Sequence, residues 1–336
     1  MTAVVTAGPE LAPAQALPAD LDAWFAEHGL SSRATCRQAQ LDLARRNERI
    51  ISLEGDLGLP EVPFGVEFPD RYRQIGIAEA NLVGVAAGLA MRGWVPLVNT
   101  FAVFATMRAC EQVRIDLAYH RSNVKLVGYY TGLSGGWAGP THHCLEDIAI
   151  TRALPGMTVL SPADAWETYQ ATVAAAEWDG PVYLRVGRAA TPAVYRTARP
   201  FRIGEAVVLR EGTDAAILAT GCLLVAEALR AAELLEADGV RCRVVNVHTL
   251  KPLDEGAVLA AASDTGLVVT VEDHNVHGGL GSAVASLLAG ERPTPVERLG
   301  VADRFCRQGA EYPDLLALQG IAAEDVRRRV LARLGS

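Results

Sequence analysis

A single carboxylate, Glu79, stands near the start of an otherwise apolar segment. Residues 75–93 read IGIAEANLVGVAAGLAMRG, and Glu79 is the only acid among them. In the first turn of a helix, an acid complements the positive end of the helix dipole. In a nearly dry crevice, the same acid has a raised proton affinity, which suits it to hydrogen-bond or protonate a heterocycle nitrogen. The segment alone leaves both interpretations open.

Aromatic and histidine side chains follow downstream. Phe101 and Phe104 lie in TFAVFATMRACEQVR, and His142 and His143 are adjacent in the Gly-rich GGWAGPTHH. Phenylalanines at this spacing usually pack in a core, although packing can coexist with stacking on a ligand. Adjacent histidines in such a loop can be solvated surface. These segments gain meaning only from the elements that position them.

Composition limits the classes of function. The chain has 336 residues, of which 50% are hydrophobic and 6% aromatic, and a net charge of -8, which predicts a soluble α/β protein of two domains. The acidic balance and the lack of a basic run argue against nucleic acid. Six cysteines without CxxC spacing argue against a disulfide framework or a zinc site. With no signal peptide and no membrane-length apolar run, the sequence predicts a cytoplasmic protein that does not bind membranes.

Short apolar runs rich in Val, Ile and Leu alternate with helical patterns, which is typical of parallel βαβ units. The sequence therefore predicts an α/β fold with two doubly wound sheets, the second of them smaller. The predicted strands are 50–55, 94–100, 124–130, 157–162, 181–187, 215–221, 242–250 and 267–273. The predicted helices are 33–49, 79–93, 107–120, 145–154, 163–178, 222–239 and 279–290.

Composition along the chain predicts the domain organisation. Residues 1–30 are interpreted as a partly flexible Ala/Pro-rich leader, and the Pro- and Arg-rich residues 191–202 as a linker between domains at 31–190 and 203–336. The HGGLGSA motif in the second domain has the glycines of a phosphate cradle. We interpret these glycines as allowing close helix packing, so no ligand is predicted there.

Four ordered motifs carry a resemblance to a known family. From about Ser31 onward, GIAEANLVGVAAGLA, TFAVFATMRACEQVR, GPTHHCLEDIAITRALPGMTVLSPAD and DGPVYLRVGR resemble the C-terminal half of transketolase in its split, two-subunit form. VEDHNVHGGLGSAVA is similar to that family's C-terminal domain. The resemblance implies a thiamine diphosphate pyrimidine-binding domain followed by a transketolase C-terminal domain.

The resemblance also implies roles for residues near the cofactor. Glu79 matches the glutamate that hydrogen-bonds the pyrimidine ring nitrogen and so promotes loss of the thiazolium proton. Phe104 matches the aromatic that stacks on the pyrimidine, and Phe101 lines the same wall. Met107 replaces another aromatic or a small residue at the ring pocket. Asp56 matches an acid near the crevice, and a turn aspartate is the alternative.

Substrate residues are carried over less completely. His142 matches the family's catalytic substrate histidine, and His143 stands where glutamine is usual. Trp137 and Ala138 replace a Glu-Asp pair whose aspartate bonds the acceptor's hydroxyl, which should redirect acceptor choice. Tyr130 replaces a histidine. The remaining matches, Arg33 and Arg188, correspond to residues that clamp a sugar phosphate, with surface ion pairing as the alternative.

The metal-binding part of the family's site has no counterpart in the sequence. Thiamine enzymes hold the diphosphate through a divalent metal bound by GDG and a later asparagine, and the chain contains no GDG. We expect Mg²⁺ (or Ca²⁺) to be bound mainly by a partner subunit, which is the N-terminal half of the enzyme and carries the GDG motif. We expect this chain to contain no metal ligand. The expected assembly is an α2β2 heterotetramer, with the crevice around Glu79 in an interface.

Three functions remain open on sequence. The first is a subunit that transfers a two-carbon ketol unit from a ketose, a sugar or sugar phosphate, to an aldehyde-type acceptor, in specialised biosynthesis. The second is the β subunit of a 2-oxoacid dehydrogenase-like enzyme that passes an acyl or ketol unit to a carrier. The third is a paralogue that retains the fold as a binding or regulatory module without catalysis.

Overall fold

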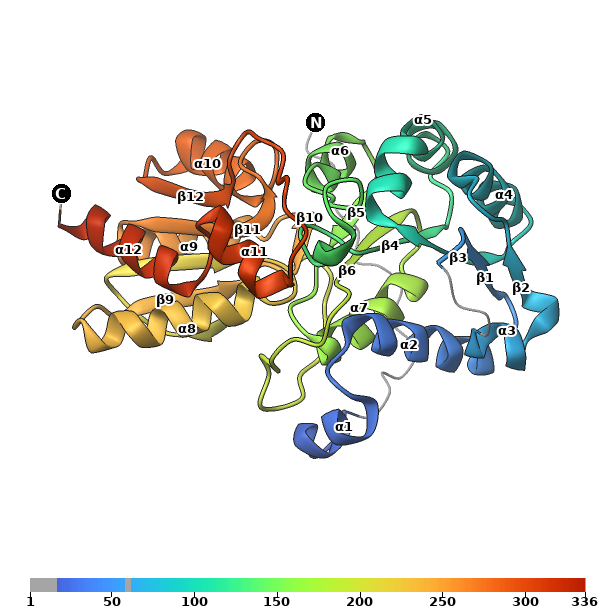
Figure 1. Cartoon of the computed structure of the whole chain (residues 1–336), viewed down its shortest axis with the longest axis horizontal. Coiled ribbons are helices and arrows are strands. Elements are labelled where there is room, and N and C mark those ends of the chain that lie inside the picture. Colours follow the sequence, from blue (N-terminus) through green and yellow to red (C-terminus); the bar gives the residue numbers. More distant parts are fainter. Residues whose placement is uncertain (1–16, 58–61, 336) are drawn as a thin grey trace.

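The computed structural model describes residues 17–57 and 62–335. They form two neighbouring α/β units, each built on its own sheet (Figure 1). The first sheet has seven strands in the order β10-β5-β6-β4-β3-β1-β2, and the second has five in the order β12-β11-β8-β9-β7. All pairings are parallel except those of β10 with β5 and of β7 with β9. The predicted α/β class with two sheets is confirmed.

The first sheet is formed mainly by the N-terminal half of the chain. Its strands are β1 Ile50–Glu54, β2 Tyr72–Gln74, β3 Val95–Phe101, β4 Lys125–Tyr129, β5 Thr158–Leu160, β6 Val182–Val186 and β10 Thr249–Lys251. The accompanying helices are α1 Leu21–His28, α2 Ser32–Arg46, α3 Pro63–Glu67, η1 Pro69–Arg71, α4 Glu79–Met91, η2 Phe104–Arg108, α5 Cys110–Gln112, η3 Val113–Tyr119, η4 Gly136–Ala138, α6 Asp147–Ala153 and α7 Ala165–Glu177.

The second sheet lies in the C-terminal half. Its strands are β7 Val207–Arg210, β8 Ala215–Ala219, β9 Cys242–Asn246, β11 Val268–Asn275 and β12 Val296–Val301. Its helices are α8 Leu224–Ala237, α9 Glu255–Thr265, α10 Leu280–Glu291, α11 Tyr312–Gln319 and α12 Ala323–Leu334.

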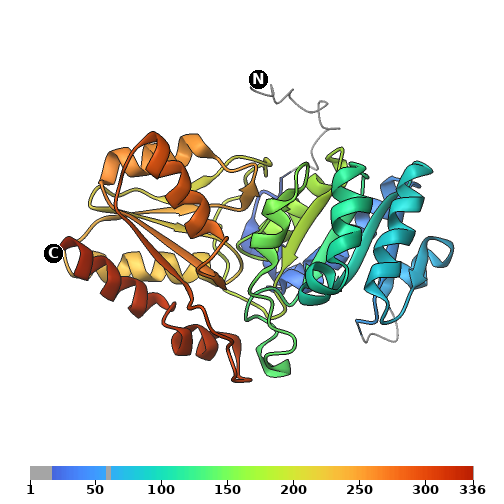
Figure 2. The ribbon, with the colours of Figure 1, turned by 90° about the horizontal axis from the view of Figure 1, so that it is seen from above.

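Helices cover both faces of each sheet (Figures 1 and 2). In the first unit, α2 and α7 lie on one face and α4 to α6 on the other, and α8 and α12 lie opposite α9 and α10 in the second. The central strands β1, β4, β6 and β8 are therefore buried at every residue. This burial explains why they are nearly continuous apolar runs in the sequence.

Three predicted segments differ from the structure. In addition, no predicted element covers β2, β7, β12, α3, α9, α11 or α12. The run 242–250 was expected to be one strand, but it divides into β9 of the second sheet and β10, which pairs with β5 of the first. The helix expected at 107–120 is interrupted, because η2 and η3 are π-helical turns on either side of α5. Residues 21–28, within the expected leader, form helix α1 because Asp20 caps it and Leu21 and Phe25 are buried.

The remaining expectations concern the linker between the two domains, the N-terminal leader and membrane-spanning helices. Residues 191–202 contain no helix or strand. The first sixteen residues of the expected leader lie outside the described residues. In the part of the chain that the structure describes, no helix has the length and apolar character needed to span a membrane.

Candidate active site

The candidate residues gather at the carboxyl ends of neighbouring parallel strands. Asp56 follows β1, Phe101 ends β3, Tyr130 follows β4 and Arg188 follows β6. This edge is where ligands bind in open α/β sheets. Asp56 (φ 53°) and Tyr130 (φ 61°) both adopt left-handed backbone conformations, which are uncommon for residues other than glycine and cluster at functional sites.

Glu79 is the first residue of α4 and is 1% exposed. Its Oε2 accepts a hydrogen bond from Arg108 Nη1 at 2.7 Å, and the Arg108 side chain is 44% exposed. The Arg108 guanidinium also lies 4.2 Å from the centre of the Phe104 ring. The sequence analysis missed Arg108, although a cation four residues after Phe104 in a helical pattern is placed to stack on that ring.

Four aromatic rings form a continuous wall beside this pair. Phe101 lies edge-on to Phe104, with ring centres 6.0 Å apart, and 4.9 Å from the ring of Tyr130. The His142 ring completes the wall, 5.3 Å from Phe101 and 5.4 Å from Phe104. Phe104 begins the π-helical turn η2, a distortion frequent at functional sites. The structure thus brings together both predicted catalytic residues and both predicted phenylalanines.

Two guanidiniums converge on the hydroxyl of Tyr130. Arg33 Nη1 donates to this oxygen at 2.9 Å and Arg188 Nε donates to it at 3.3 Å. The Arg188 guanidinium also lies 5.3 Å from the ring centre of Trp137. Among the described residues, neither arginine pairs with a carboxylate. Their positive charge therefore remains available to an anion from outside.

The other predicted site residues are placed less centrally. Met107 and Trp137 are 49% and 60% exposed. Asp56 is exposed, and its backbone N–H donates to Gln74 Oε1 at 2.8 Å. His143 is buried beside the backbone of Gly136 and Cys306, away from the ring contacts described above, and burial lowers its pKa.

The HGGLGSA motif surrounds a carboxylate of the chain itself. Glu272 Oε2 accepts from the backbone N–H of Leu280 at 2.6 Å, and Oε1 accepts from that of Gly281 at 2.8 Å. A Cβ on Gly279 would lie 2.0 Å from Glu272 Oε2, so only glycine fits there. Glu272 thus occupies the helix N-terminus at which a phosphate would bind.

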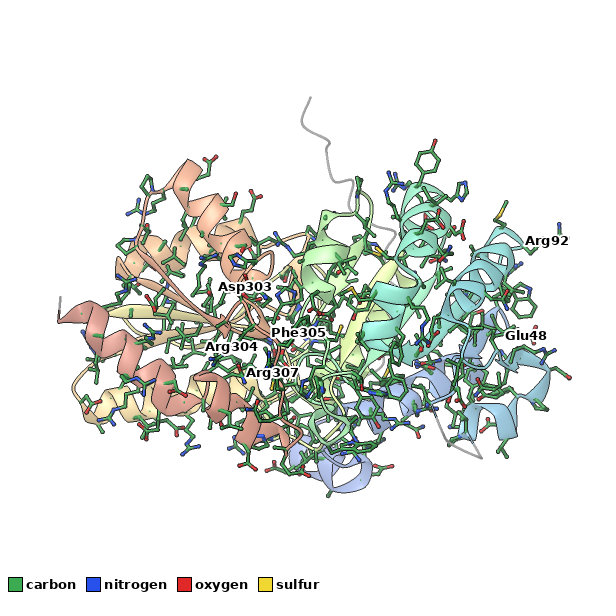
Figure 3. All side chains as sticks on the ribbon, turned by 45° about the horizontal axis from the view of Figure 1, so that its top comes forward. Glu48, Arg92, Asp303, Arg304, Phe305 and Arg307 are labelled. Atoms are coloured by element: carbon green, nitrogen blue, oxygen red, sulfur yellow. The ribbon has the colours of Figure 1, made fainter. Side chains whose placement is uncertain are left out.

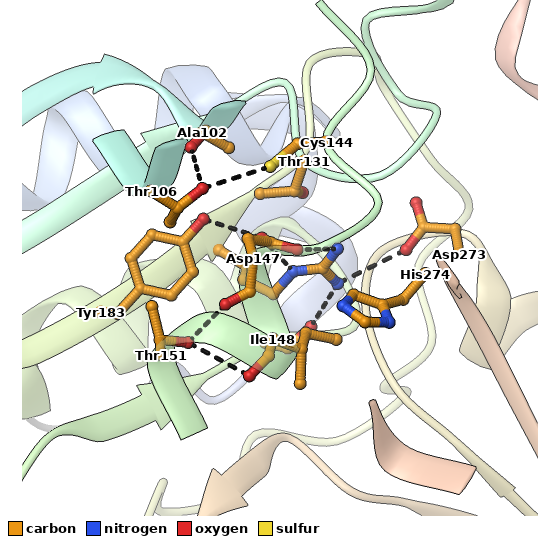
Figure 4. A network of polar contacts seen from close by, with 12 residues as sticks. Ala102, Thr106, Thr131, Cys144, Asp147, Ile148, Thr151, Tyr183, Asp273 and His274 are labelled. Carbon is orange, nitrogen blue, oxygen red and sulfur yellow. Dashed lines mark hydrogen bonds and ion pairs between the residues drawn. The ribbon is translucent and has the colours of Figure 1, made fainter. Parts of the chain in front are cut away.

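A buried charge network near the site was also missed. Arg185 on β6 donates from Nε to Asp147 Oδ2 at 2.8 Å and from Nη1 to Asp273 Oδ1 at 3.4 Å (Figure 4). All three are buried. A charged residue within the apolar strand VYLRV was the available signal, because a charge buried in a sheet needs partners.

A further feature of the described residues concerns groups of side chains that could bind a metal ion. Within residues 17–57 and 62–335, no group of three or more His, Cys, Asp or Glu side chains is placed to hold a metal ion.

The matches to known proteins agree with this geometry. Residues 28–193 match the transketolase pyrimidine binding domain and residues 204–326 match the transketolase C-terminal domain. The 6-deoxy-6-sulfo-D-fructose transketolase subunit SqwH of Clostridium sp. (strain MSTE9) is 44% identical over 90% of this chain and 93% of that protein. An apulose-4-phosphate transketolase subunit of Phocaeicola vulgatus is 37% identical over 91% of this chain and 98% of that protein.

A solved structure extends the similarity to three dimensions. A split gene transketolase, in the form of an inactive β4 tetramer, matches with a TM-score of 0.84 and 41% identity, over 91% of this chain and 99% of that one. These relatives confirm the resemblance seen in the sequence, and they favour neither a 2-oxoacid dehydrogenase subunit nor a module without catalysis. The chain belongs to the transketolase family, as one subunit of a split, thiamine diphosphate-dependent transketolase-like transferase.

Proposed function

We propose that this chain supplies the pyrimidine side of a thiamine diphosphate site and the anion-binding end of a ketose site, and that a partner subunit supplies the diphosphate side. The single observation that supports this best is the contact of buried Glu79 with Arg108 beside the wall of Phe101, Phe104 and His142.

The residues present fit the pyrimidine half of the cofactor. A ring that stacks on Phe104 needs an apolar wall, and its protonated ring nitrogen needs a carboxylate in a poorly solvated position. Phe104 and the 1% exposed Glu79 meet these two needs. Bound thiamine diphosphate supplies a nucleophilic carbon that accepts the two-carbon unit. Glu79 would hold a proton at the pyrimidine nitrogen, Phe104 and Phe101 would orient the ring, and Met107 and Asp56 would border it.

His142 would handle protons on the substrate. Its ring packs against Phe101 and Phe104, so it lies on the same wall that would hold the cofactor. From there the imidazole can hold a hydroxyl of the donor or move a proton from it, because one ring nitrogen can donate a hydrogen bond while the other accepts.

The substrate should be a ketose with an anionic end. Arg33 and Arg188 offer two guanidiniums without a described carboxylate partner, joined through the hydroxyl of Tyr130. Two of the relatives are named for a sulfonated ketose and for a ketose phosphate. Phosphate and sulfonate share the tetrahedral set of acceptor oxygens that guanidinium groups recognise. Trp137 and Ala138, in place of the family's acidic pair, would favour an acceptor without the hydroxyl that this pair bonds.

The metal and the diphosphate would be held by a separate subunit with the GDG motif, in an α2β2 heterotetramer. Support comes from the absence of GDG in the sequence and from the solved relative whose β4 form is inactive. The apolar side chains of Ile77, Met91 and Met107 are exposed at both ends of α4 and on η2, and we assign them to the interface with that subunit.

Titration of the chain with its candidate partner tests this function. We expect thiamine diphosphate with Mg²⁺ to bind only to the mixed complex, and hydrogen–deuterium exchange at the thiazolium carbon to collapse in Glu79→Gln. The amide is nearly isosteric but cannot act as an acid. Glu48→Gln, a change at an exposed acid of the same unit (Figure 3), is the matched control. Normal exchange in Glu79→Gln, or cofactor binding to the chain alone, would refute the proposal.

A further inference from the structure

The loop that bears Trp137 and His142 is closed at its neck by backbone hydrogen bonds. It connects β4 to α6, and the neck is formed where Gly132 N–H donates to Cys144 O at 3.0 Å and Cys144 N–H donates to Gly132 O at 2.9 Å. We call residues 131–144 the substrate loop. It contains one short helical turn, η4, and its internal hydrogen bonds join residues close in sequence, such as Ala138 N–H to Gly135 O and His142 N–H to Gly139 O.

The neck of the substrate loop rests on a side chain of the other structural unit. Asp273, near the end of β11, accepts from the backbone N–H of Leu133 through Oδ2 at 3.3 Å. Gly132 has φ +56°, and a Cβ there would lie 1.9 Å from the same oxygen. The contact is therefore too close for any residue other than glycine.

Asp273 is itself held from both sides. Tyr312 donates its hydroxyl to Asp273 Oδ2 at 2.6 Å, and Arg185 Nη1 donates to Oδ1 at 3.4 Å. Figure 4 shows Asp147 and Asp273 approaching this guanidinium from opposite directions. Both Asp273 oxygens are thus engaged, which leaves the carboxylate no freedom to rotate.

Arg185 connects Asp273 to two further parts of the active site, the end of the substrate loop and the segment that bears Arg188. Asp147, which begins α6 three residues after the substrate loop, accepts from Arg185 Nε and Nη2 at 2.8 and 3.3 Å. Arg188, one of the two anion-binding arginines, follows Arg185 by three positions on the same segment. The network therefore joins the loop's neck, the loop's exit and the anion-binding segment.

We propose that Asp273 is a positioning residue: from the C-terminal unit it fixes the neck of the substrate loop, so that His142 lies against Phe101 and Phe104 and Trp137 lies beside Arg188. Its catalytic consequence rests on the proposed function, whereas its effect on the loop does not. No contact between Asp273 and a substrate is involved.

Asp273→Asn breaks the support with little change of volume. If the amide oxygen faces Tyr312 and Leu133, the amide NH₂ faces the Arg185 guanidinium, donor against donor. If the amide is turned round, the NH₂ faces the backbone N–H of Leu133, although the Tyr312 hydroxyl can accept from it by donating to Cys222 O instead. Either orientation loses at least one bond. Asp303→Asn, a change at an exposed acid of the same unit (Figure 3), is the matched control.

Amide hydrogen exchange of the whole chain measures the effect without any activity assay. We expect exchange in residues 131–144 to become about tenfold faster in Asp273→Asn, as for the loss of one hydrogen bond, with β3 and β8 unchanged. Tyr312→Phe, which removes one bond to Asp273, should give a smaller change in the same peptides and decides the matter if Asp273→Asn does not fold. Exchange in the loop equal to that of Asp303→Asn, or a rise spread evenly over both sheets in Tyr312→Phe, would overturn the proposal.

The mixed enzyme tests the catalytic consequence. In Asp273→Asn, kcat/KM for the ketose should fall about tenfold or more, because small displacements of catalytic groups are costly. Affinity for thiamine diphosphate should change less than about twofold, since Glu79 and Phe104 lie on other elements. Faster loop exchange with unaltered kcat/KM would refute positioning for catalysis. If the wild-type mixture is inactive while the loop responds as expected, the proposed function fails and the support of the loop stands.

Discussion

Glu79 and Glu272 are both buried carboxylates beside a helix N-terminus, one in each structural unit, but their surroundings differ. Glu272 accepts two backbone N–H groups of α10 and touches the space that a Cβ of Gly279 would fill. Glu79 pairs with one half-exposed guanidinium, that of Arg108. A buried acid satisfied by backbone groups is a structural feature. A buried acid whose partner is a half-exposed side chain can exchange that partner for a ligand.

Turnover should separate the two acids most strongly. In the mixed enzyme, Glu79→Gln should lower kcat by about 100-fold or more, the usual contribution of a positioned acid. Glu272→Gln should leave kcat within about threefold of the wild type, since the hydrogen bonds of Glu272 go to the backbone of α10 and not to the aromatic wall. Steady-state kinetics at saturating cofactor gives both values. Equal losses in the two variants would remove the distinction.

In unfolding by urea, we expect Glu272→Gln to have the larger effect and Glu79→Gln the smaller one. Glu272→Gln replaces a carboxylate oxygen by an NH₂ that faces a backbone N–H, and we expect a loss of about 1–3 kcal/mol in the free energy of unfolding. Glu79→Gln should cost less than about 1 kcal/mol, because its partner is partly solvated. The comparison fails if Glu79→Gln proves the more destabilising change.

The pH dependence of stability adds a direction to this test. Burial raises the pKa of Glu272, with His274 and the two N–H groups opposing the rise. Above pH 4.5 and below the raised value, the folded chain therefore binds more protons than the unfolded chain, and the unfolding free energy falls as pH rises. Glutamine does not titrate, so the deficit of Glu272→Gln should be largest at acidic pH and shrink as pH increases. Urea titrations from pH 4.5 upward, on both proteins, measure it; a deficit that grows with pH would contradict the assignment.

The smallest effect is expected at the partner of Glu79. Arg108→Met should change the unfolding free energy by no more than about 1 kcal/mol, because the ion pair is half-exposed and the methionine can still cover Phe104. Arg92→Met, at an exposed arginine just after α4 (Figure 3), is the control. A loss of several kcal/mol in Arg108→Met alone would mean that this arginine is structural and that Glu79 is not free to bind a ligand.

Local sequence was sufficient to predict the elements and residues whose pattern is contained within a short segment of the chain. The central strands were predictable because burial on both faces leaves continuous apolar runs, whereas the partly exposed β2, β7 and β12 were missed. Glu79, Phe104 and His142 could be proposed because their motifs keep order and spacing. The structure places these three beside one another, and their roles remain predictions.

Long-range geometry accounts for what was missed. The meeting of Asp147, Arg185 and Asp273 depends on the packing of one unit on the other, which no local pattern encodes. Helix α1 had a readable signal, with Asp20 as a cap before apolar residues at helical spacing, but the Ala/Pro-rich segment around it concealed the pattern. The predicted strand 242–250 ends in residues of β10, which belongs to the other sheet, and no glycine or proline between β9 and β10 marks the change.

Strand β10 has a practical consequence for anyone who divides this protein. A fragment that stops at the connection near residue 200 contains every residue of the aromatic wall, and it looks like a natural unit for expression. It lacks Thr249–Lys251, however, which cover the outer edge of β5. Such a fragment would present an unpaired strand edge to other molecules, and uncovered edges recruit neighbouring chains. The first unit should therefore be expressed together with the second, which supplies strand β10.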